Sequence, residues 1–280
     1  MPITRILTAL FWWMTFNDEL TDEILGVLKK FADDPAVKGF IITGYGTAAF
    51  SAGADIGKFP SMLGDPDASA QYARDCAQVQ TFMDQMEKPV VAALNGLAMG
   101  GGLEVAIRCH SMVAMQNAIL QFPEITLGIL PGIGGCVVPY RKWPKGAALF
   151  HEMICFGKPL KAKEAAEIGM IASLADNYQD LIQAAIEEVN NLQGKVTGIP
   201  QGKVDIPAIV IPDRPTAGKQ VLSKEAVTIT AQTIQKGVAT EDLAEALEIG
   251  YQGFGEIACS EAAKEGISAF LERRKPEFKK

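Results

Sequence analysis

One segment restricts the possible folds of this 280-residue chain more than any other: an apolar strand that leads into a glycine-rich helix start. Val90–Leu94 is an uninterrupted apolar run and reads as a strand. Asn95-Gly96 then turns the chain, and the run Gly100-Gly101-Gly102 opens a helix that we expect to end near Arg108. Strands followed by helices, where the order repeats, predict an α/β architecture.

The same order recurs along the first 190 or so residues. An amphipathic helix is expected over 18–33, with Asn17 as its cap, and a buried strand over 37–43. Residues 44–60 read as a glycine-containing loop, and a single helix over 67–87 is ended by Lys88-Pro89. The other expected elements are strands at 111–115 and 119–122 and helices at roughly 145–155, 161–168 and 178–192.

The pattern changes after residue 192. Glycine and proline accumulate between residues 193 and 218, which therefore read as a long loop or linker. Helices are expected again at 219–236, 240–252 and 260–273. We divide the chain accordingly into a core over 1–192, a loop or linker insertion over 193–218 and a helical C-terminal region over 219–280.

Composition excludes several classes of protein. The 48% of apolar residues suffice for a large core. No apolar run reaches the ~18 residues of a membrane span, and no small-residue cleavage site follows the apolar stretch Ile6–Phe16, so we expect no signal peptide. The net charge of −7 argues against nucleic acid as the main partner. Five widely spaced cysteines and two histidines, without a CxxC pair, indicate reduced thiols in a cytoplasmic protein and no metal site.

Two glutamates follow loops rich in glycine or proline. Glu104 follows the run Gly100–Gly102, and Glu124 stands in Phe122-Pro123-Glu124, just before a second glycine-rich stretch over 128–135. A pair of carboxylates at one reacting centre can deliver and remove protons. The alternative is that Glu104 is a first-turn acid of its helix and Glu124 an acid of a surface loop. The glycine run alone fits a simple turn into a helix equally well, but it is not a dinucleotide fingerprint, since G-x-G-x-x-G is absent.

Several motifs, taken in order, resemble those of the crotonase superfamily, the enoyl-CoA hydratase/isomerase group. The resemblance covers about residues 17–192 and 219–280. The matching segments are Asn17–Leu20 (first-helix start), Phe50–Ile56 (first oxyanion loop), Lys88–Gly96 with Gly100–Glu104 (second oxyanion loop), Phe122–Glu124 with the Pro-Gly-x-Gly-Gly run (third loop) and Glu265–Phe278 (C-terminal helix).

This resemblance implies a spiral of repeated ββα units with a helical C-terminal trimerisation region. It implies an enoyl-CoA hydratase, a lyase of fatty acid metabolism that adds water across the C2–C3 double bond of a 2-enoyl-CoA thioester. The backbone N–H groups of Ala54 and Gly101 would form the oxyanion hole, Glu124 would exchange the proton at C2, and Glu104 would deprotonate the water that attacks C3. The implied substrate-binding residues are Ala52, Gly53, Asp55, Ile56, Gly100 and Lys275.

The resemblance implies no separate cofactor, since coenzyme A is part of the substrate, and it implies a homotrimer or dimer of trimers. An apolar helix face that packs against another subunit would fit five positions: Phe254, Ile257, Ile267, Phe270 and Leu271. Isomerisation, decarboxylation and thioester hydrolysis on the same scaffold share the oxyanion hole and remain alternatives, as does a non-catalytic acyl-CoA-binding domain.

Some features depart from the family pattern or fit two interpretations. Residues 1–16 do not resemble the family's opening strands, and 193–218 is similar to the insertion of members fused to, or derived from, hydroxyacyl-CoA dehydrogenase proteins. Cys136-Val137-Val138 replaces a common Thr-Gln-Arg. Arg273–Lys275 resembles a basic tail that meets the nucleotide phosphate of a neighbouring subunit, although cations at a helix end fit equally. Phe59, Met62 and Leu63 fit either the acyl pocket or the core.

Overall fold

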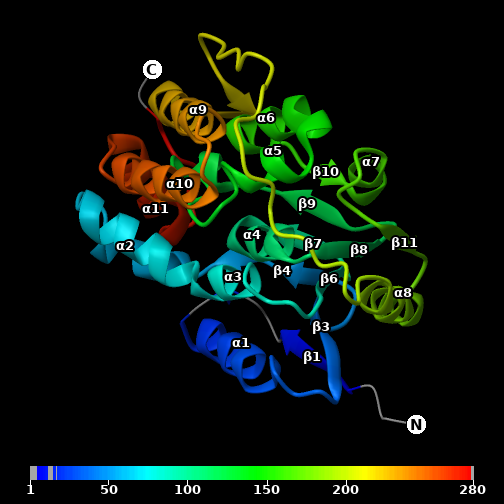
Figure 1. Ribbon diagram of the computed structural model, residues 1–280. Coiled ribbons are helices and arrows are strands. Elements are labelled where there is room, and N and C mark those ends of the chain that lie inside the picture. Colours follow the sequence, from blue (N-terminus) through cyan, green and yellow to red (C-terminus); the bar gives the residue numbers. More distant parts are fainter. Residues whose placement is uncertain (1–4, 12–14, 17, 279–280) are drawn as a thin grey trace. The chain divides into compact units, whose positions relative to one another are not determined.

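The computed structural model describes residues 5–11, 15–16 and 18–278 (Figure 1). The chain divides into two compact units. The first unit comprises Met1–Ala54, Cys76–Leu120 and Leu160–Gly198. The second comprises Asp55–Asp75, Gln121–Pro159 and Ile199–Lys280. Asn17, the predicted helix cap, lies outside the described residues.

Two sheets organise the first unit. A parallel sheet has the strand order β1-β3-β6-β8-β11, and a second sheet has the order β10-β9-β7-β4. Strands that follow one another alternate between the sheets: β3, β6 and β8 each lie in the first sheet, and their successors β4, β7 and β9 lie in the second. This repeated two-strand step confirms the predicted α/β spiral. The bounds are β1 Arg5–Phe11, β3 Val37–Gly44, β4 Ala49–Ser51, β6 Val90–Leu94, β7 Leu97–Met99, β8 Ser111–Met115, β9 Ile119–Gln121, β10 Leu160–Lys161 and β11 Ser173–Ala175.

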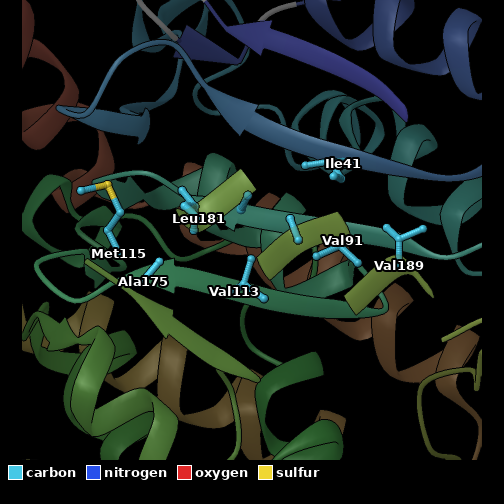
Figure 2. Close-up of a cluster of buried hydrophobic side chains, with 9 residues drawn as sticks. Ile41, Val91, Val113, Met115, Ala175, Leu181 and Val189 are labelled. Atoms are coloured by element: carbon cyan, nitrogen blue, oxygen red, sulfur yellow. The ribbon is translucent and has the colours of Figure 1, made fainter. Parts of the chain in front are cut away.

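Helix α8 (Tyr178–Asn191) covers one face of the parallel sheet. Its residues Leu181, Ala185 and Val189 recur every four positions, so they share one helix face. Figure 2 shows this face against side chains of the sheet. The strand residues of the cluster are Ile41, Val91, Ala93, Val113, Met115 and Ala175. Apolar runs in the sequence thus become strands buried on both faces, as parallel sheets require.

The other helices of the first unit are α1 (Asp18–Phe31), α3 (Gln78–Met83), α4 (Gly100–Arg108) and α7 (Ala162–Glu167). The single helix predicted over 67–87 is wrong, because the chain breaks at Ala77, where ψ is 0°. Helix α2 (Pro66–Cys76) belongs almost entirely to the second unit, whereas α3 belongs to the first. Neither glycine nor proline stands at the break, so the sequence carries no signal for it.

Helices dominate the second unit, which confirms the predicted helical C-terminal region. Helix α9 (Lys224–Val238) packs on α10 (Leu243–Ala258), and α11 (Glu261–Leu271) follows. Each of the three begins at a Ser or Asp side chain that accepts a hydrogen bond from a first-turn N–H. The shorter helices are η1 (Ile56–Ser61), η2 (Glu124–Leu127), α5 (Val138–Lys142), η3 (Pro144–Gly146) and α6 (Ala147–Phe156).

The predicted linker over 193–218 is docked rather than free. The Gly202 N–H donates to Glu241 O at 2.8 Å, and the Val204 N–H donates to Val238 O at 2.8 Å. The segment ends in a hairpin of β12 (Thr216–Ala217) and β13 (Gln220–Val221). Helix α9 therefore starts at residue 224, five positions later than predicted.

Two further expectations about strands need correction. Residues 1–16, which do not look like strands of the family in sequence, supply β1, which pairs with β3, and β2 (Thr15–Phe16), which pairs with β5 (Gly53–Ala54). Residues 44–60 are not a plain loop, since they contain β4, β5 and most of η1. Strands β2, β4 and β5 have only two or three residues, too few to show a periodic pattern in the sequence. Within the described part of the chain, no helix combines the length and apolar character needed to cross a membrane.

Candidate functional site

Glycines allow the loop of Ala54 to approach the start of α4 backbone to backbone. Gly53 has a φ of 102°, a region that L residues rarely adopt. A Cβ built on Gly53 would lie 3.4 Å from the Met99 carbonyl oxygen and 3.9 Å from the Gly100 Cα. A Cβ built on Gly102 would overlap the Cβ and Oγ of Ser51. The chain segments that carry Ala54 and Gly101 are therefore in direct contact, and this contact requires glycine on both sides.

Substituting Gly102 with alanine is expected to lower the free energy of unfolding by about 1–3 kcal/mol, since the new methyl group overpacks against Ser51. Gly26→Ala in α1 is the matched control, because no atom lies within 4 Å of its added Cβ. In an open helix position this change stabilises by roughly 0.5–1 kcal/mol. Urea denaturation of both variants measures the difference. A Gly102→Ala protein as stable as Gly26→Ala would contradict the close contact.

Helix α4 presents Gly101 and Glu104 on one face. The first four N–H groups of a helix have no partner inside the helix, so the N–H of Gly101 is not used by the helix ladder. These N–H groups also carry the positive end of the helix dipole. Glu104 follows Gly101 by three residues, and its side chain leans back over the first turn. Glu104 is only 3% exposed and lies outside the first turn, which excludes the interpretation of a simple first-turn acid.

Asn95, interpreted from the sequence as a turn residue only, holds the segment that precedes the Ala54 loop. Its Oδ1 accepts from the Gly44 N–H at 3.0 Å. Its Nδ2 donates to Gly46 O at 2.8 Å and to Ala49 O at 3.0 Å. The side chain is fully buried, so these three bonds replace its hydration. Sequence reasoning missed this role, and the Asn-Gly pair was the only available signal.

A buried ion pair holds the far end of α4. The Arg108 Nε donates to Asp84 Oδ1 at 3.1 Å, and Arg108 Nη2 bonds Asp84 Oδ2. The Arg108 side chain is 0% exposed. Removing one partner of such a pair typically costs about 3–5 kcal/mol, since the other charge stays buried. The pair thus connects α4 to the end of α3, and no local sequence pattern indicates that these two residues meet.

Glu124 lies in the second unit, as the first residue of η2. It is half-buried, and its Oε2 atom is buried, so the interpretation of a surface-loop acid is wrong. Helix α11 packs closely on η2: a Cβ built on Gly128 would overlap Ala262 O, and one built on Gly266 would overlap Leu127 O. Gly128 ends the turn with a φ of 70°. The position of Glu124 therefore depends on glycines of both η2 and α11.

The other predicted binding residues differ in burial and in their hydrogen bonds. The Asp55 side chain accepts from the Gly57 N–H at 2.9 Å and so caps η1, whose first residue is the half-buried Ile56. Ala52 is exposed. Phe59 is buried and packs edge-on against Tyr72 and Phe254, with ring centroids 5.8 and 5.9 Å apart. Phe59 therefore packs within the core of the second unit.

The C-terminal cations divide between an ion pair and the surface. Arg274 binds Glu265 through two nitrogens, with Nη2 2.9 Å from Oε2. The bonds from Arg274, with a further one from the Glu277 N–H, lower the pKa of Glu265 to about 2. Arg274 thus forms an ion pair within its own chain. Arg273 and Lys275 are exposed.

The apolar replacement Cys136-Val137-Val138 is buried throughout.

Both histidines contact other side chains or backbone of the core. His110 Nδ1 accepts from the Val90 N–H at 2.9 Å. His151 packs against the Tyr140 ring at 5.6 Å between centroids, and burial lowers its pKa.

The structure therefore groups the predicted site residues in two sets. The first unit carries Ala52, Gly53, Ala54, Gly100, Gly101 and Glu104. The second unit carries Asp55, Ile56, Glu124 and Lys275.

The chain is also similar in sequence to known proteins. The family model for enoyl-CoA hydratase/isomerase matches residues 14–200. A probable enoyl-CoA hydratase of Bacillus subtilis is 33% identical over 94% of this chain and 90% of its own. The crotonyl-CoA hydratase of Syntrophomonas wolfei is 32% identical over 94% of this chain and 88% of its own.

Solved structures extend the agreement to the fold. A crystal structure of enoyl-CoA hydratase from Bacillus anthracis matches with a TM-score of 0.56 and 26% identity, over 95% of this chain and 90% of the other. A crystal structure from Mycobacterium avium subsp. paratuberculosis matches with a TM-score of 0.65 over 98% of this chain and 95% of the other. Its 20% identity makes it evidence for the fold alone. The matches in sequence and fold together show that this chain belongs to the enoyl-CoA hydratase/isomerase family.

Proposed function

We propose that this protein is an enoyl-CoA hydratase, which adds water across the C2–C3 double bond of a 2-enoyl-CoA thioester. The observation that carries the proposal is the close approach of the loop around Gly53 to the start of α4, with buried Glu104 one turn along the same helix. The relatives named as enoyl-CoA and crotonyl-CoA hydratases support it.

In this proposal the N–H groups of Ala54 and Gly101 donate to the thioester oxygen as negative charge develops there. Gly101 stands in the first turn of α4, where the helix dipole favours an anion. The groups are fixed in place before the reaction begins, so no reorganisation opposes them. Losing one such donor typically raises the barrier by about 3–4 kcal/mol.

The two carboxylates then divide the proton transfers. Glu104 accepts a proton from water as the water oxygen bonds to C3, and the electrons of the double bond move into the enolate. Glu124, in its acid form, gives a proton to C2, and the enolate collapses back to the thioester. The net change is the addition of one water. Exchange with solvent returns Glu104 to the carboxylate and Glu124 to the acid.

Coenzyme A recognition is proposed for Ala52, Gly53, Asp55, Ile56 and Gly100. The exposed Ala52 offers its backbone, and the η1 segment after Asp55 offers an apolar surface. Among the C-terminal cations, Lys275 is the better candidate for a phosphate, because Arg274 is already paired with Glu265.

We further propose a homotrimer or a dimer of trimers. Of the five positions predicted for the interface, only Phe270 and Leu271 are largely exposed, at 52% and 47%. Phe254, Ile257 and Ile267 are buried within the second unit, so they cannot form the interface as expected. Light scattering should give a multiple of the 30.0 kDa chain, starting at about three times that mass. A mass of one chain would contradict an oligomer.

The direct test uses crotonyl-CoA and follows loss of the absorbance of the conjugated thioester. The proposal predicts turnover with 3-hydroxybutyryl-CoA as the product. Tight acyl-CoA binding without turnover of any 2-enoyl-CoA would instead support a non-catalytic binding domain. Formation of free crotonate or of a shifted double bond would instead identify thioester hydrolysis or isomerisation, two of the rival reactions on this scaffold.

A further inference from the structure

We propose that residues 215–222, here called the strap, fix the η2 turn that presents Glu124, and that Gln220 is a positioning residue for that carboxylate. The strap includes the end of the predicted loop or linker over 193–218. The inference rests on the proposed function, in which Glu124 exchanges the proton at C2.

The strap is a closed hairpin. Thr216 pairs with Val221 and Ala217 with Gln220. Gly218 has a φ of 57° at the first position of the two-residue loop, as a type II′ turn requires. The Leu222 N–H closes the base of the hairpin by donating to Pro215 O at 2.9 Å. An isolated two-stranded hairpin is marginally stable in water, so the strap needs a surface to dock on.

Gln220 supplies a direct bond from the strap to η2. Its Nε2 donates to the Thr126 carbonyl oxygen at 2.8 Å, and its side chain is half-buried. Thr126 stands two residues after Glu124 and itself bonds Pro123 O, from its N–H at 2.9 Å and from its Oγ1 at 2.6 Å. The bond from Gln220 thus holds a backbone carbonyl within η2, two residues after Glu124.

Gly157 provides a second contact between strap and turn. A Cβ built on Gly157 would lie 3.3 Å from Thr126 Cγ2 and 3.8 Å from Ala217 Cβ. The backbone of Gly157 therefore lies close to both η2 and β12. The Gly157 carbonyl also accepts from Gln121 Nε2 at 2.7 Å, which ties down the chain just before Glu124.

The turn depends on such contacts because it is short. A four-residue 3-10 helix has poor hydrogen-bond geometry and little stability of its own. Helix α11 holds η2 through Gly128 and Gly266, and the strap supplies independent contacts through Thr126. Without the Thr126 contact, the position of the Glu124 carboxyl group is less well defined. Misplacing a catalytic group by 1 Å can lower the rate by up to about 100-fold.

The test compares two glutamines that make the same kind of bond. Gln220→Met keeps the length of the side chain and removes its donor. We expect kcat on crotonyl-CoA to fall roughly tenfold, with KM changed less than about twofold, because geometry rather than binding is lost. Gln193→Met is the matched control, since Gln193 Nε2 donates to Lys38 O at 2.9 Å in the first unit. It should keep the wild-type kcat. Gln220→Lys restores a donor and should recover most of the rate.

Amide hydrogen exchange separates this inference from the proposed function. The Thr126, Gly128 and Ile129 N–H groups bond within the turn, and they should exchange faster in Gln220→Met than in wild type or Gln193→Met. This readout needs no turnover, so it decides the role of the strap even if the wild-type protein hydrates no enoyl-CoA. If these N–H groups exchange at the same rate in Gln220→Met as in wild type, the strap does not fix the η2 turn. Faster exchange with wild-type kcat, or no recovery with Gln220→Lys, would overturn the positioning role of Gln220.

Discussion

Glu124→Gln is expected to lower the turnover of 2-enoyl-CoA by roughly 10²–10⁴-fold, the usual contribution of a positioned acid or base. The amide cannot give or take the proton at C2. The change is nearly isosteric, and α11 holds the turn through backbone contacts of Gly128 and Gly266, so the fold should remain. Steady-state kinetics with crotonyl-CoA measures the loss.

Glu167→Gln is the control for this variant. Glu167 ends α7 and is exposed, so its charge change should leave kcat within about twofold of wild type, as surface substitutions usually are close to neutral. Glu124→Gln should also abolish exchange of the C2 protons of butyryl-CoA with deuterium oxide. Near-wild-type turnover or retained exchange would show that Glu124 does not act at C2.

Glu104→Gln is expected to reduce hydration by a similar factor, about 10²–10⁴-fold, but through a different step. The variant loses the base that takes the proton from water at C3. Proton exchange at C2 of butyryl-CoA should continue within about tenfold of wild type, because Glu124 and the oxyanion hole remain. Isotope exchange followed by mass spectrometry gives the second rate.

The two glutamate variants thus predict opposite outcomes in one assay. Loss of C2 exchange in Glu104→Gln, with retention in Glu124→Gln, would mean that the roles are reversed. Urea denaturation should accompany these measurements, since Glu104 is 3% exposed and a buried amide with unpaired groups costs about 1–3 kcal/mol.

The sequence predicted those parts of the fold that local patterns determine. Val90–Leu94 and Ser111–Met115 were predicted to the residue, because apolar strands between turn signals have clear limits. Helix α8 was predicted within one residue, since its apolar face repeats every four positions. The short strands β4, β5 and β7 were missed, because two or three residues show no period and only their distant partners make them strands.

The candidate site divides in the same way. Gly101, Glu104 and Glu124 are recognisable from motifs in which neighbouring residues create the required backbone. The supporting contacts are not, because they join residues far apart: Asn95 reaches Gly44 across 51 positions, and Gln220 reaches Thr126 across 94. No local sequence pattern predicts these hydrogen bonds between side chain and backbone, because they form only when the fold brings the distant residues together.

Hydration of crotonyl-CoA by the wild-type protein in deuterium oxide and, separately, in ¹⁸O-labelled water is the decisive experiment for the proposed water addition. We expect 3-hydroxybutyryl-CoA with a single deuterium at C2 and one ¹⁸O atom in the C3 hydroxyl group, and with the thioester intact. Label in the carboxyl group of a free acid, deuterium at C4, or recovery of unchanged substrate would contradict water addition by a pair of carboxylates beside an oxyanion hole.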